Sequence, residues 1–510
     1  MPATASIPLT DTDGARVGAR GWAALAVLML PVLLVSVDNT VLSFALPEIS
    51  LALRPSGTEQ LWIIDAYSLV LAGLLVTMGV LGDRFGRRRM LLIGATGFAV
   101  VSVLAAFAPT AGLLIAARAA LGVFGAMLMP STLSLLRSIF TNRDQRRLAI
   151  AIWASAFSAG SALGPAVGGF LLEHFAWGSV FLIAVPVLVP LLIGGLWLLP
   201  ESSDPNPGRI DPLGILLSMG AMIPVVYAVK EFAVEGPSAK AFGITVFGLL
   251  MGALFVRRQL RSETPMLDMT LFRRGGFTGA ILVNLLSVVA LVGFLYFVSQ
   301  QLQLVVGLSP MVAGVALVPG MAAMIVAGLT VVPISRRVPP HVIVPVALVF
   351  SVIAYLIVAA TAQLNVVAWL VVAFIVLGIG IGAAETISNE LILANAPAEK
   401  AGAASAVSET AYELGAVLGT AVLGGIITAF YRGALTIPDG VPVEAAAHAL
   451  ETLAGAYTEA AALDGPLGAS LWDAASSAFG SGVVTTSLIG AGLVAVALVV
   501  AATTLRPVRR

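Results

Sequence analysis

Several residue types are absent or scarce in this chain of 510 residues, and each absence excludes a class of chemistry. The chain has no cysteine, which excludes disulfides, thiolate metal sites and cysteine nucleophiles. Its only histidines, His174, His341 and His448, lie at or beyond the ends of predicted helices, so a metalloenzyme is disfavoured. Charged residues make up 11% of the chain, whereas an ordinary soluble domain carries roughly a quarter. An ordinary soluble protein is therefore excluded.

The signature motifs of common enzymes are also missing. The sequence contains no Gly-x-x-x-x-Gly-Lys-Ser/Thr loop, no His-Glu-x-x-His and no Gly-x-Ser-x-Gly. We therefore expect no ATP hydrolysis through a phosphate-binding loop and no enzyme activity. We also expect no metal and no nucleic-acid partner.

What the chain has instead is long apolar stretches, and hydrophobic residues make up 59% of it. A helix needs about 20 apolar residues to cross the hydrocarbon core of a bilayer. The stretches predict an all-α polytopic membrane protein with fourteen transmembrane helices. The predicted spans are 22–46, 61–81, 90–109, 112–135, 147–171, 178–199, 211–229, 241–256, 277–303, 311–333, 341–361, 365–393, 402–430 and 482–505.

The basic residues predict how the chain is oriented. An even number of spans puts both termini on one side, and 22 of the 27 lysines and arginines fall on that side. Cytoplasmic segments are enriched in basic residues, so we expect both termini in the cytoplasm. Arg54, Lys230, Lys240 and Arg432 are assigned to the opposite side, and Arg118 alone lies inside a span.

The start and the composition of the chain indicate its location. The first 20 residues lack an apolar core, so we expect no cleavable signal peptide and expect the first span to act as the insertion signal. Arginine far outnumbers lysine, and alanine, glycine and valine abound, as is typical of a GC-rich bacterial genome. The expected location is the bacterial cytoplasmic membrane.

One long connection, 431–480, faces the outside in this topology. It carries six acidic residues against one arginine, and its alanine-rich stretches 443–462 and 467–479 are compatible with short helices. Two interpretations stay open, a solvated cap and a gating hairpin that attracts cations.

A charged turn with the sequence GVLGDRFGRRR occupies 79–89, between the second and third spans. Gly82 and Gly86 allow two helix ends to approach closely, and Asp83 is placed to pair with an arginine or to cap a helix. The alternative is a plain positively charged loop. The candidate residues of this turn are Gly79, Gly82, Asp83, Arg84, Gly86 and Arg87.

Asp38 lies inside the first predicted span and Arg118 inside the fourth. A carboxylate at such depth costs about 2.5–3.5 kcal/mol on insertion scales, so Asp38 needs water, a partner or a task. Its bland alternative is a hydrogen bond with Asn39 or Thr40. A buried guanidinium has five donors and stays charged, so Arg118 must find carboxylates or carbonyls. It is a candidate for relaying protonation to conformation, with a purely structural role as the alternative.

The fifth span contains GSALGPAVGG at 160–169. Gly160, Gly164 and Gly168 recur every four residues and so present a flat face for close helix contact. Pro165 removes one backbone donor and bends the helix.

The second span opens with Trp62, and Asp65 follows on the next turn as either a solvated residue at the helix start or a substrate-binding residue. Tyr67, Trp153 and Phe157 offer aromatic faces for a cation, although such residues also simply pack.

Three acids of the second half complete the candidate set. Glu409 and Glu413 are spaced i, i+4 and share one helix face, as do Glu385 and Asn389. Two carboxylates on one face repel each other when both are ionised, which makes one of them a usable proton carrier.

Taken together, these motifs resemble the 14-helix drug:H+ antiporters of the major facilitator superfamily. The turn at 79–89 looks like the signature loop of the superfamily, and 160–169 looks like the motif that marks its drug exporters. The stretches 36–47, 62–67, 114–125, 303–314 and 401–415 are also similar to this family.

The resemblance implies two six-helix bundles, 22–200 and 277–505, joined by two extra helices within 201–276, with tails 1–21 and 506–510. It also implies a central site that opens alternately to each side. One departure matters: some relatives place an acid in the tenth span, and 311–333 contains none.

The function implied is export of lipophilic, mostly cationic or amphiphilic drugs in exchange for protons across the lipid bilayer. The proton gradient replaces any cofactor, and we expect a monomer. A proton-coupled symporter that imports a small metabolite is the runner-up, and the motif at 160–169 argues against it. A membrane enzyme or receptor is disfavoured because no catalytic constellation is visible.

Overall fold

The computed structural model describes residues 16–203, 211–234, 236, 238–262, 265, 269–395, 401–463 and 465–505, and every regular element within them is helical. The first seven helices are α1 (Ala19–Leu53), α2 (Gly57–Phe85), α3 (Arg87–Ala106), α4 (Ala111–Ile139), α5 (Arg143–His174), α6 (Ser179–Leu182) and α7 (Ala184–Leu198). Two helices follow, α8 (Pro212–Val234) and α9 (Ala239–Arg261).

The rest of the chain begins with a short 3-10 turn, η1 (Leu271–Arg273). It continues with α10 (Gly275–Gln300), η2 (Gln301–Val305), α11 (Pro310–Ser335), α12 (Pro340–Thr361), η3 (Ala362–Leu364) and α13 (Val367–Ala394). The last elements are α14 (Ala401–Leu418), η5 (Gly419–Gly424), α15 (Gly425–Ala434), α16 (Val443–Glu451), α17 (Leu453–Ala462) and α18 (Pro466–Thr504).

The predicted spans agree with these helices. Thirteen helical segments within the described residues are long and apolar enough to cross a membrane. The remaining predicted span, 147–171, lies within α5, a helix of 32 residues. Three spans are divided between consecutive helical elements: 178–199 corresponds to α6 and α7, 277–303 to α10 and η2, and 402–430 to α14, η5 and α15. The expected all-α fold of a polytopic membrane protein is confirmed.

Local sequence explains where these helices begin and bend. Ser56 accepts a hydrogen bond from the Glu59 amide, and the Glu59 carboxylate accepts one from the Ser56 amide, so a capping box starts α2. Ser309 caps α11, whose first residue is Pro310. The π-helical η5 follows α14 directly, and such segments often mark functional sites in helices.

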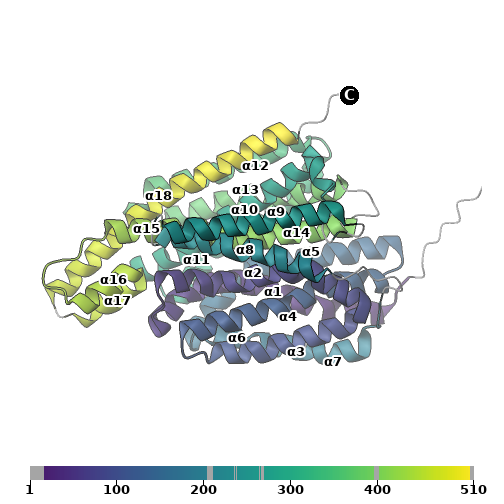
Figure 1. Cartoon of the computed structure of the whole chain (residues 1–510), viewed down its shortest axis with the longest axis horizontal. Helices are drawn as coiled ribbons and strands as arrows, with labels where there is room; N and C mark the ends of the chain where they lie inside the picture. The colour runs from purple at the N-terminus through teal and green to yellow at the C-terminus, as the bar shows by residue number, and fades with distance from the viewer. Residues whose placement is uncertain are drawn as a thin grey trace, which may run out of the picture.

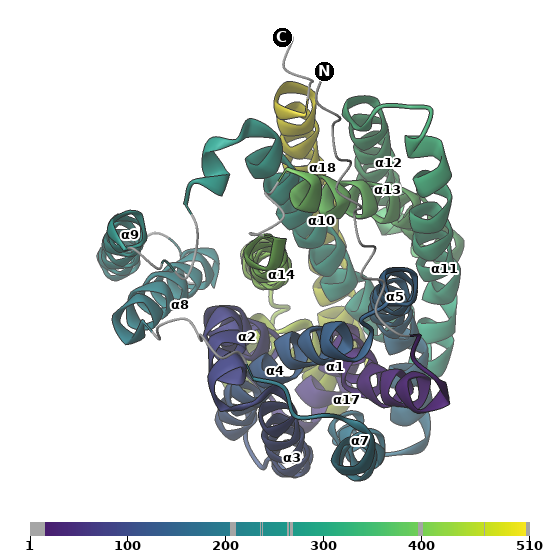
Figure 2. The same ribbon diagram turned by 90° about the vertical axis from the view of Figure 1, so that its right-hand side faces the viewer.

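Figure 1 shows a long molecule in which most helices run along the long axis. Seen along that axis in Figure 2, α1, α2, α3, α4 and α7 lie on one side and α10 to α13 and α18 on the other. The helix α14 lies centrally, opposite α2, and α5 packs against both α1 and α11. The pair α8 and α9 stands at the periphery, with α8 packed on α2 and α15. The expected bundle limits, 22–200 and 277–505, remain a prediction.

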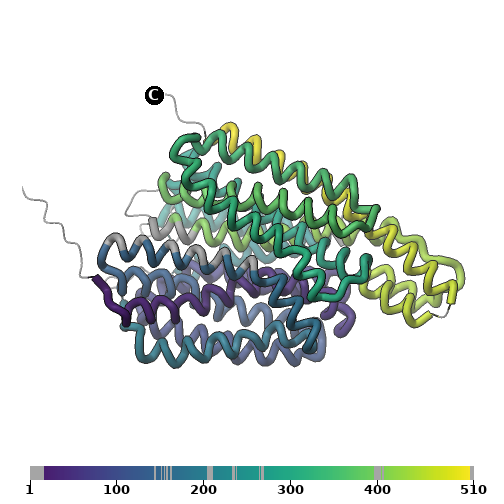
Figure 3. Tube along the Cα trace, turned by 180° about the vertical axis from the view of Figure 1, so that it is seen from behind, coloured from purple at the N-terminus to yellow at the C-terminus, as the bar shows by residue number. Residues whose placement is uncertain are grey.

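The two ends of the molecule differ. The helix α1 begins and α18 ends at one end, which we call the termini end (Figure 3). The helices α16 and α17 lie at the other, which we call the hairpin end (Figure 1). The stretch 443–462 forms these two short helices, whereas 467–479 is the first part of the long α18.

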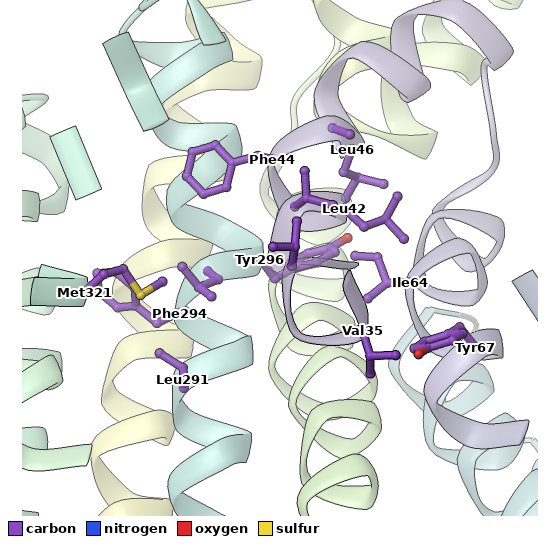
Figure 4. Close-up of a cluster of buried hydrophobic side chains, with 14 of the residues drawn as sticks. Val35, Leu42, Phe44, Leu46, Ile64, Tyr67, Leu291, Phe294, Tyr296 and Met321 are labelled. Atoms are coloured by element: carbon purple, nitrogen blue, oxygen red, sulfur yellow. The ribbon is translucent and has the colours of Figure 1, made fainter. Parts of the chain in front are cut away.

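Hydrogen bonds join the two sides of the molecule at the hairpin end. The Gly57 amide donates to Glu451 at 3.2 Å, and Arg432 pairs with the same carboxylate at 2.8 Å. Deeper in, the Gln303 amide donates to the Phe44 carbonyl at 3.0 Å. Figure 4 shows buried side chains of α1 and α2 facing those of α10 and α11. One apolar core therefore continues across the boundary between the two sides of the molecule, which we call the seam.

The outward surface is apolar. Leu104 of α3, Trp197 of α7 and Leu216 of α8 are each more than half exposed. Such a surface is stable against lipid and unstable against water, so the protein is a multi-pass membrane protein.

Candidate functional site

Asp38 and Arg118 form a buried ion pair. The Arg118 Nη1 atom lies 2.7 Å from Asp38 Oδ2, and the two side chains are 2% and 9% exposed. Arg118 also donates to the carbonyl of Ile63 at 3.1 Å and contacts that of Ile64 at 3.5 Å. Asp38 thus supplies the carboxylate that Arg118 requires. Protonation of Asp38 would remove the negative charge facing the guanidinium.

A second buried ion pair joins α2 to α8. The Lys230 Nζ atom lies 2.8 Å from Asp65 Oδ2, and both side chains are essentially inaccessible. The ammonium also donates to the Leu61 carbonyl at 3.1 Å and lies 3.8 Å from the centre of the Trp62 ring. Asp65 is therefore no solvated helix start in this structure.

The sequence assigns Lys230 to the outer side, just beyond the end of an apolar span, and gives no indication that its side chain is buried. The apolar run ends at 229, but α8 continues to Val234 and Lys230 lies inside it with 0% exposure. Hydropathy gives no signal for this arrangement because a lysine at the end of a span normally reaches water. A packing contact with α2 keeps it buried instead.

The aromatic faces near these pairs are occupied by the protein's own cations. The Arg118 guanidinium lies 4.6 Å from the centre of the Tyr67 ring, just as Lys230 lies over Trp62. Trp153 is half-buried, and its indole N–H donates to the Thr132 hydroxyl at 3.1 Å. The side chain of Phe157 lies outside the described part of the structure.

The acids of α13 and α14 have a different environment. Glu413 is fully buried, and one of its oxygens accepts a hydrogen bond from the Asn39 amide at 3.3 Å. Glu385, Glu409 and Glu413 each have one buried carboxylate oxygen without a hydrogen-bond partner. In the part of the chain that the structure describes, none of the three faces a basic side chain in an ion pair.

The contact between Asn39 and Glu413 joins two of these groups. Asn39 follows Asp38 on α1, so the Asp38–Arg118 pair and the α14 acids lie on either side of one seam. Glu409 lies one turn before Glu413 on α14. Among the described contacts, nothing links Glu385 to this group; its neighbour Asn389 instead bonds with Asn284 and Ser408.

The glycines of α5 pack against α1. A Cβ atom added at Gly160 or Gly164 would overlap the side chains of Ser36 or Thr40, and one at Gly168 would meet Val41 at 2.7 Å. This face of α5 therefore rests on the turn of α1 that carries Asp38.

The other side of α5 packs against α11. A Cβ atom at Gly169 would meet the Pro310 carbonyl at 2.6 Å, and one at Gly314 would overlap the Pro165 carbonyl. The motif at 160–169 thus sits between a helix of each half.

The charged turn is held together by ion pairs. Asp83 pairs with Arg87 at 2.5 Å, and the Arg87 amide donates to the Ser202 carbonyl. Gly86 has a φ of 102°, which favours glycine, and an added Cβ would also press on Glu201.

Glycine is less necessary at two other positions of this turn. A Cβ atom at Gly82 would meet Arg87 at 3.8 Å, and one at Gly79 would meet Pro130 at 3.7 Å, both ordinary contacts. The positive φ therefore explains Gly86 in this structure, and close packing explains neither Gly79 nor Gly82. Arg84 stays exposed beside Phe85.

Glu201 is a residue that sequence reasoning missed. It contacts Arg88 at 3.7 Å and Arg89 at 3.6 Å, which links the segment after α7 to the turn between α2 and α3. Its position directly after an apolar span was the feature of the sequence that could have identified Glu201 as a candidate.

Comparisons with known proteins agree with this architecture. The family model of the Major Facilitator Superfamily matches residues 28–420. The chain is 56% identical over 95% of its length to the multidrug efflux pump LfrA of Mycolicibacterium smegmatis, covering 96% of that protein. It is 36% identical to the methyl viologen resistance protein SmvA of Salmonella typhimurium, over 90% of this chain and 93% of the relative.

A solved structure shows the same fold. A bacterial homologue of the human lysosomal transporter Spinster, in an inward-facing and unoccupied conformation, superposes with a TM-score of 0.68 at 16% identity. The match covers 98% of this chain and all of the other. From its helices, its motifs and these matches, the chain belongs to the major facilitator superfamily.

Proposed function

We propose that this chain is a proton-coupled antiporter that exports lipophilic, mostly cationic drugs from the cytoplasm or the inner leaflet by alternating access. One structural observation carries the proposal: Glu385, Glu409 and Glu413 each have a buried carboxylate oxygen without a hydrogen-bond partner, and none of them pairs with a cation among the described residues. An intramembrane acid without a partner is costly unless it binds a proton or a cation. The relatives, named as a multidrug pump and a methyl viologen resistance protein, support drugs as the cargo.

Competition for the same carboxylates supplies the coupling. A lipophilic cation that settles near Glu409 and Glu413 lowers the affinity of these groups for protons, and a proton that binds there weakens the hold on the cation. Glu385, which also has one buried carboxylate oxygen without a partner, is a further candidate of this kind. Protons from the outside then release the drug, and the protonated carrier returns.

The Asp38–Arg118 pair is proposed to relay protonation to conformation. While Asp38 is charged, the pair holds α1 to α4 and the arginine holds the backbone of α2. Neutralising Asp38 frees a buried guanidinium, which must then find new acceptors. The glycine face of α5 gives α1 a smooth surface against which to shift.

The remaining site residues have proposed roles in gating and binding. Asp65 is proposed to couple α2 to the extra helix α8 through Lys230. The Tyr67 ring lies against the Arg118 guanidinium and is proposed to stabilise its charge. Trp153 and Phe157 are proposed substrate contacts. The turn 79–89 and the glycines of α5 are proposed gating elements.

Both termini are proposed to face the cytoplasm. The proton gradient is proposed as the sole energy source, and the transporter is proposed to be a monomer.

Ethidium accumulation in cells that lack other pumps tests the function. Cells that produce the chain should accumulate less ethidium than empty cells, and an uncoupler should abolish the difference. Cells that produce Glu409→Gln/Glu413→Gln at the same membrane level provide the matched control and should accumulate more dye than the parent. An uncoupler-insensitive difference would contradict proton coupling, and higher accumulation in producing cells would indicate import.

A further inference from the structure

The groove between the two extra helices has no role in the export mechanism proposed above. The main packing partner of the helix α9 is α8. In Figure 2, α9 lies at the outer edge of the molecule. A hollow of about 700 Å³ lies along their seam, lined by Ala221 and Val225 of α8 and by Gly248 and Gly252 of α9. The small residues keep this groove open and almost wholly apolar.

A second hollow of about 520 Å³ continues the groove toward the termini end. Leu213, Leu217 and Leu254 line it. Arg257 and Arg261 line both hollows, so the two arginines stand where the hollows meet. The groove is therefore apolar along its length and basic at one end.

Neither Arg257 nor Arg261 pairs with an acidic side chain in the described part of the chain. They are spaced i, i+4 on α9, where like charges repel. Asp211 is engaged by the neighbouring Arg258, at 2.7 Å, and this bond lowers the pKa of the Asp211 carboxyl. Within the described part of the chain, Arg257 and Arg261 make no hydrogen bond or ion pair. An anion between them would relieve their repulsion.

The dimensions and charges fit a single kind of occupant. From Arg261 to Gly248 the helix rises by about 20 Å, which exceeds the roughly 15 Å depth of one leaflet's hydrocarbon. We propose that the groove between α8 and α9 binds an anionic phospholipid, with the phosphate between Arg257 and Arg261 and one acyl chain along Gly252 and Ala221. Basic pockets between transmembrane helices on the cytoplasmic side suit such headgroups.

Other occupants fit less well. A lipophilic cation would meet two uncompensated arginines at the mouth of the groove and be repelled. A second copy of the chain, docked by a two-fold axis through this face, would bring four arginines together. The anionic lipid alone satisfies both the apolar wall and the charge.

Native mass spectrometry of the purified full chain tests the proposal. The protein is mixed with palmitoyl-oleoyl-phosphatidylglycerol or with the zwitterionic phosphatidylcholine of the same chains. The parent should retain the anionic lipid preferentially. In Arg257→Gln/Arg261→Gln the preference should fall by about 30-fold, since each basic residue near an anionic lipid contributes roughly a fivefold preference.

Two further variants separate the groove from general charge. Arg336→Gln/Arg337→Gln removes two exposed arginines next to α11, outside this groove, and should keep the preference. Gly252→Leu fills the groove without touching the arginines, since a Cβ there meets only Ala221 at 3.5 Å, and should lose the tightly bound lipid. Equal losses in both arginine variants, unchanged retention in Gly252→Leu, or a two-chain species in place of the lipid would overturn the proposal. Because the readout is lipid binding, it is independent of drug export.

Discussion

The acids of α1 and α2 and the acids of α13 and α14 occupy opposite electrostatic environments. Asp38 and Asp65 each hold a buried cation at 2.7–2.8 Å, and each of those cations also lies over an aromatic ring. Across the seam, Glu385, Glu409 and Glu413 lie in described helices with buried oxygens and no cation opposite. One hydrogen bond, from Asn39 to Glu413, joins the two regions.

The difference indicates a division of labour. A buried ion pair is strongly destabilised when one partner is lost, so the paired acids are suited to hold and switch helices. Acids without a cationic partner are suited to exchange protons and cations, because no cation of the described chain pairs with them. The predictions below test this division.

The largest effect is expected for Asp38→Asn. This variant keeps the size of the side chain but leaves the Arg118 guanidinium buried without a negative charge. Ethidium efflux should fall to the background of cells without the transporter, whereas Asp38→Glu should retain part of it. Membrane levels are measured by immunoblot. Parental resistance to every cation tested would remove Asp38 from the coupling site.

A similarly large effect is expected for Gly164→Leu, because the new side chain would displace the turn of α1 next to Asp38. Cysteine pairs introduced at each end of the molecule can trap the two states, and the absence of native cysteines keeps this test clean. We expect one crosslink to disappear together with efflux. Gly492→Leu is the control, since a Cβ there meets nothing. Both crosslinks and normal efflux in Gly164→Leu would show ordinary packing.

Lys230→Met should have an intermediate effect. In soluble proteins the loss of one partner from a buried pair costs about 3–5 kcal/mol, so the melting temperature in detergent should fall clearly. The double variant Asp65→Asn/Lys230→Met should recover stability but not efflux. Lys240→Met removes a pair whose lysine is 61% exposed and should change little. Recovery of efflux in the double variant would mean that Asp65 is structural.

The smallest single effects are expected for Glu409→Gln and Glu413→Gln, and they should differ. Only one of two interacting acids carries the exchanged proton at a time. Glu413 is fully buried and contacts Asn39, so its loss should slow efflux about tenfold, or 1.4 kcal/mol, and the loss of Glu409 should slow it less. Initial efflux rates at fixed external pH provide the measurement. Parental rates in both single variants and the double variant would exclude the paired acids.

Much of the fold followed from the sequence. The fourteen apolar stretches predicted the helices because hydrocarbon thickness fixes the length of a span. The alanine-rich 443–462 gave two short helices, as expected, whereas 467–479 became part of α18, because nothing local ends a helix there.

The candidate site was predicted less completely. The need of Arg118 for a carboxylate followed from its five donors, and Asp38 was named as an intramembrane acid, but their pairing was not deduced. The burial of Lys230 was not predicted, because a lysine at the end of an apolar run normally reaches water. Close packing was predicted for Gly160, Gly164 and Gly168, and the structure shows it. Close packing was also predicted for Gly82, but a Cβ atom added there would make only ordinary van der Waals contacts.

The sequence by itself determined which segments cross the membrane and which charges lie within them, because both depend on local hydropathy. Only the tertiary structure decided which charges pair. Asp38 and Arg118 are 80 positions apart, and Asn39 and Glu413 are 374 apart. Transmembrane helices are apolar all round, so periodicity does not reveal which face meets a neighbour, and close packing and hydrogen bonding between helices decide it.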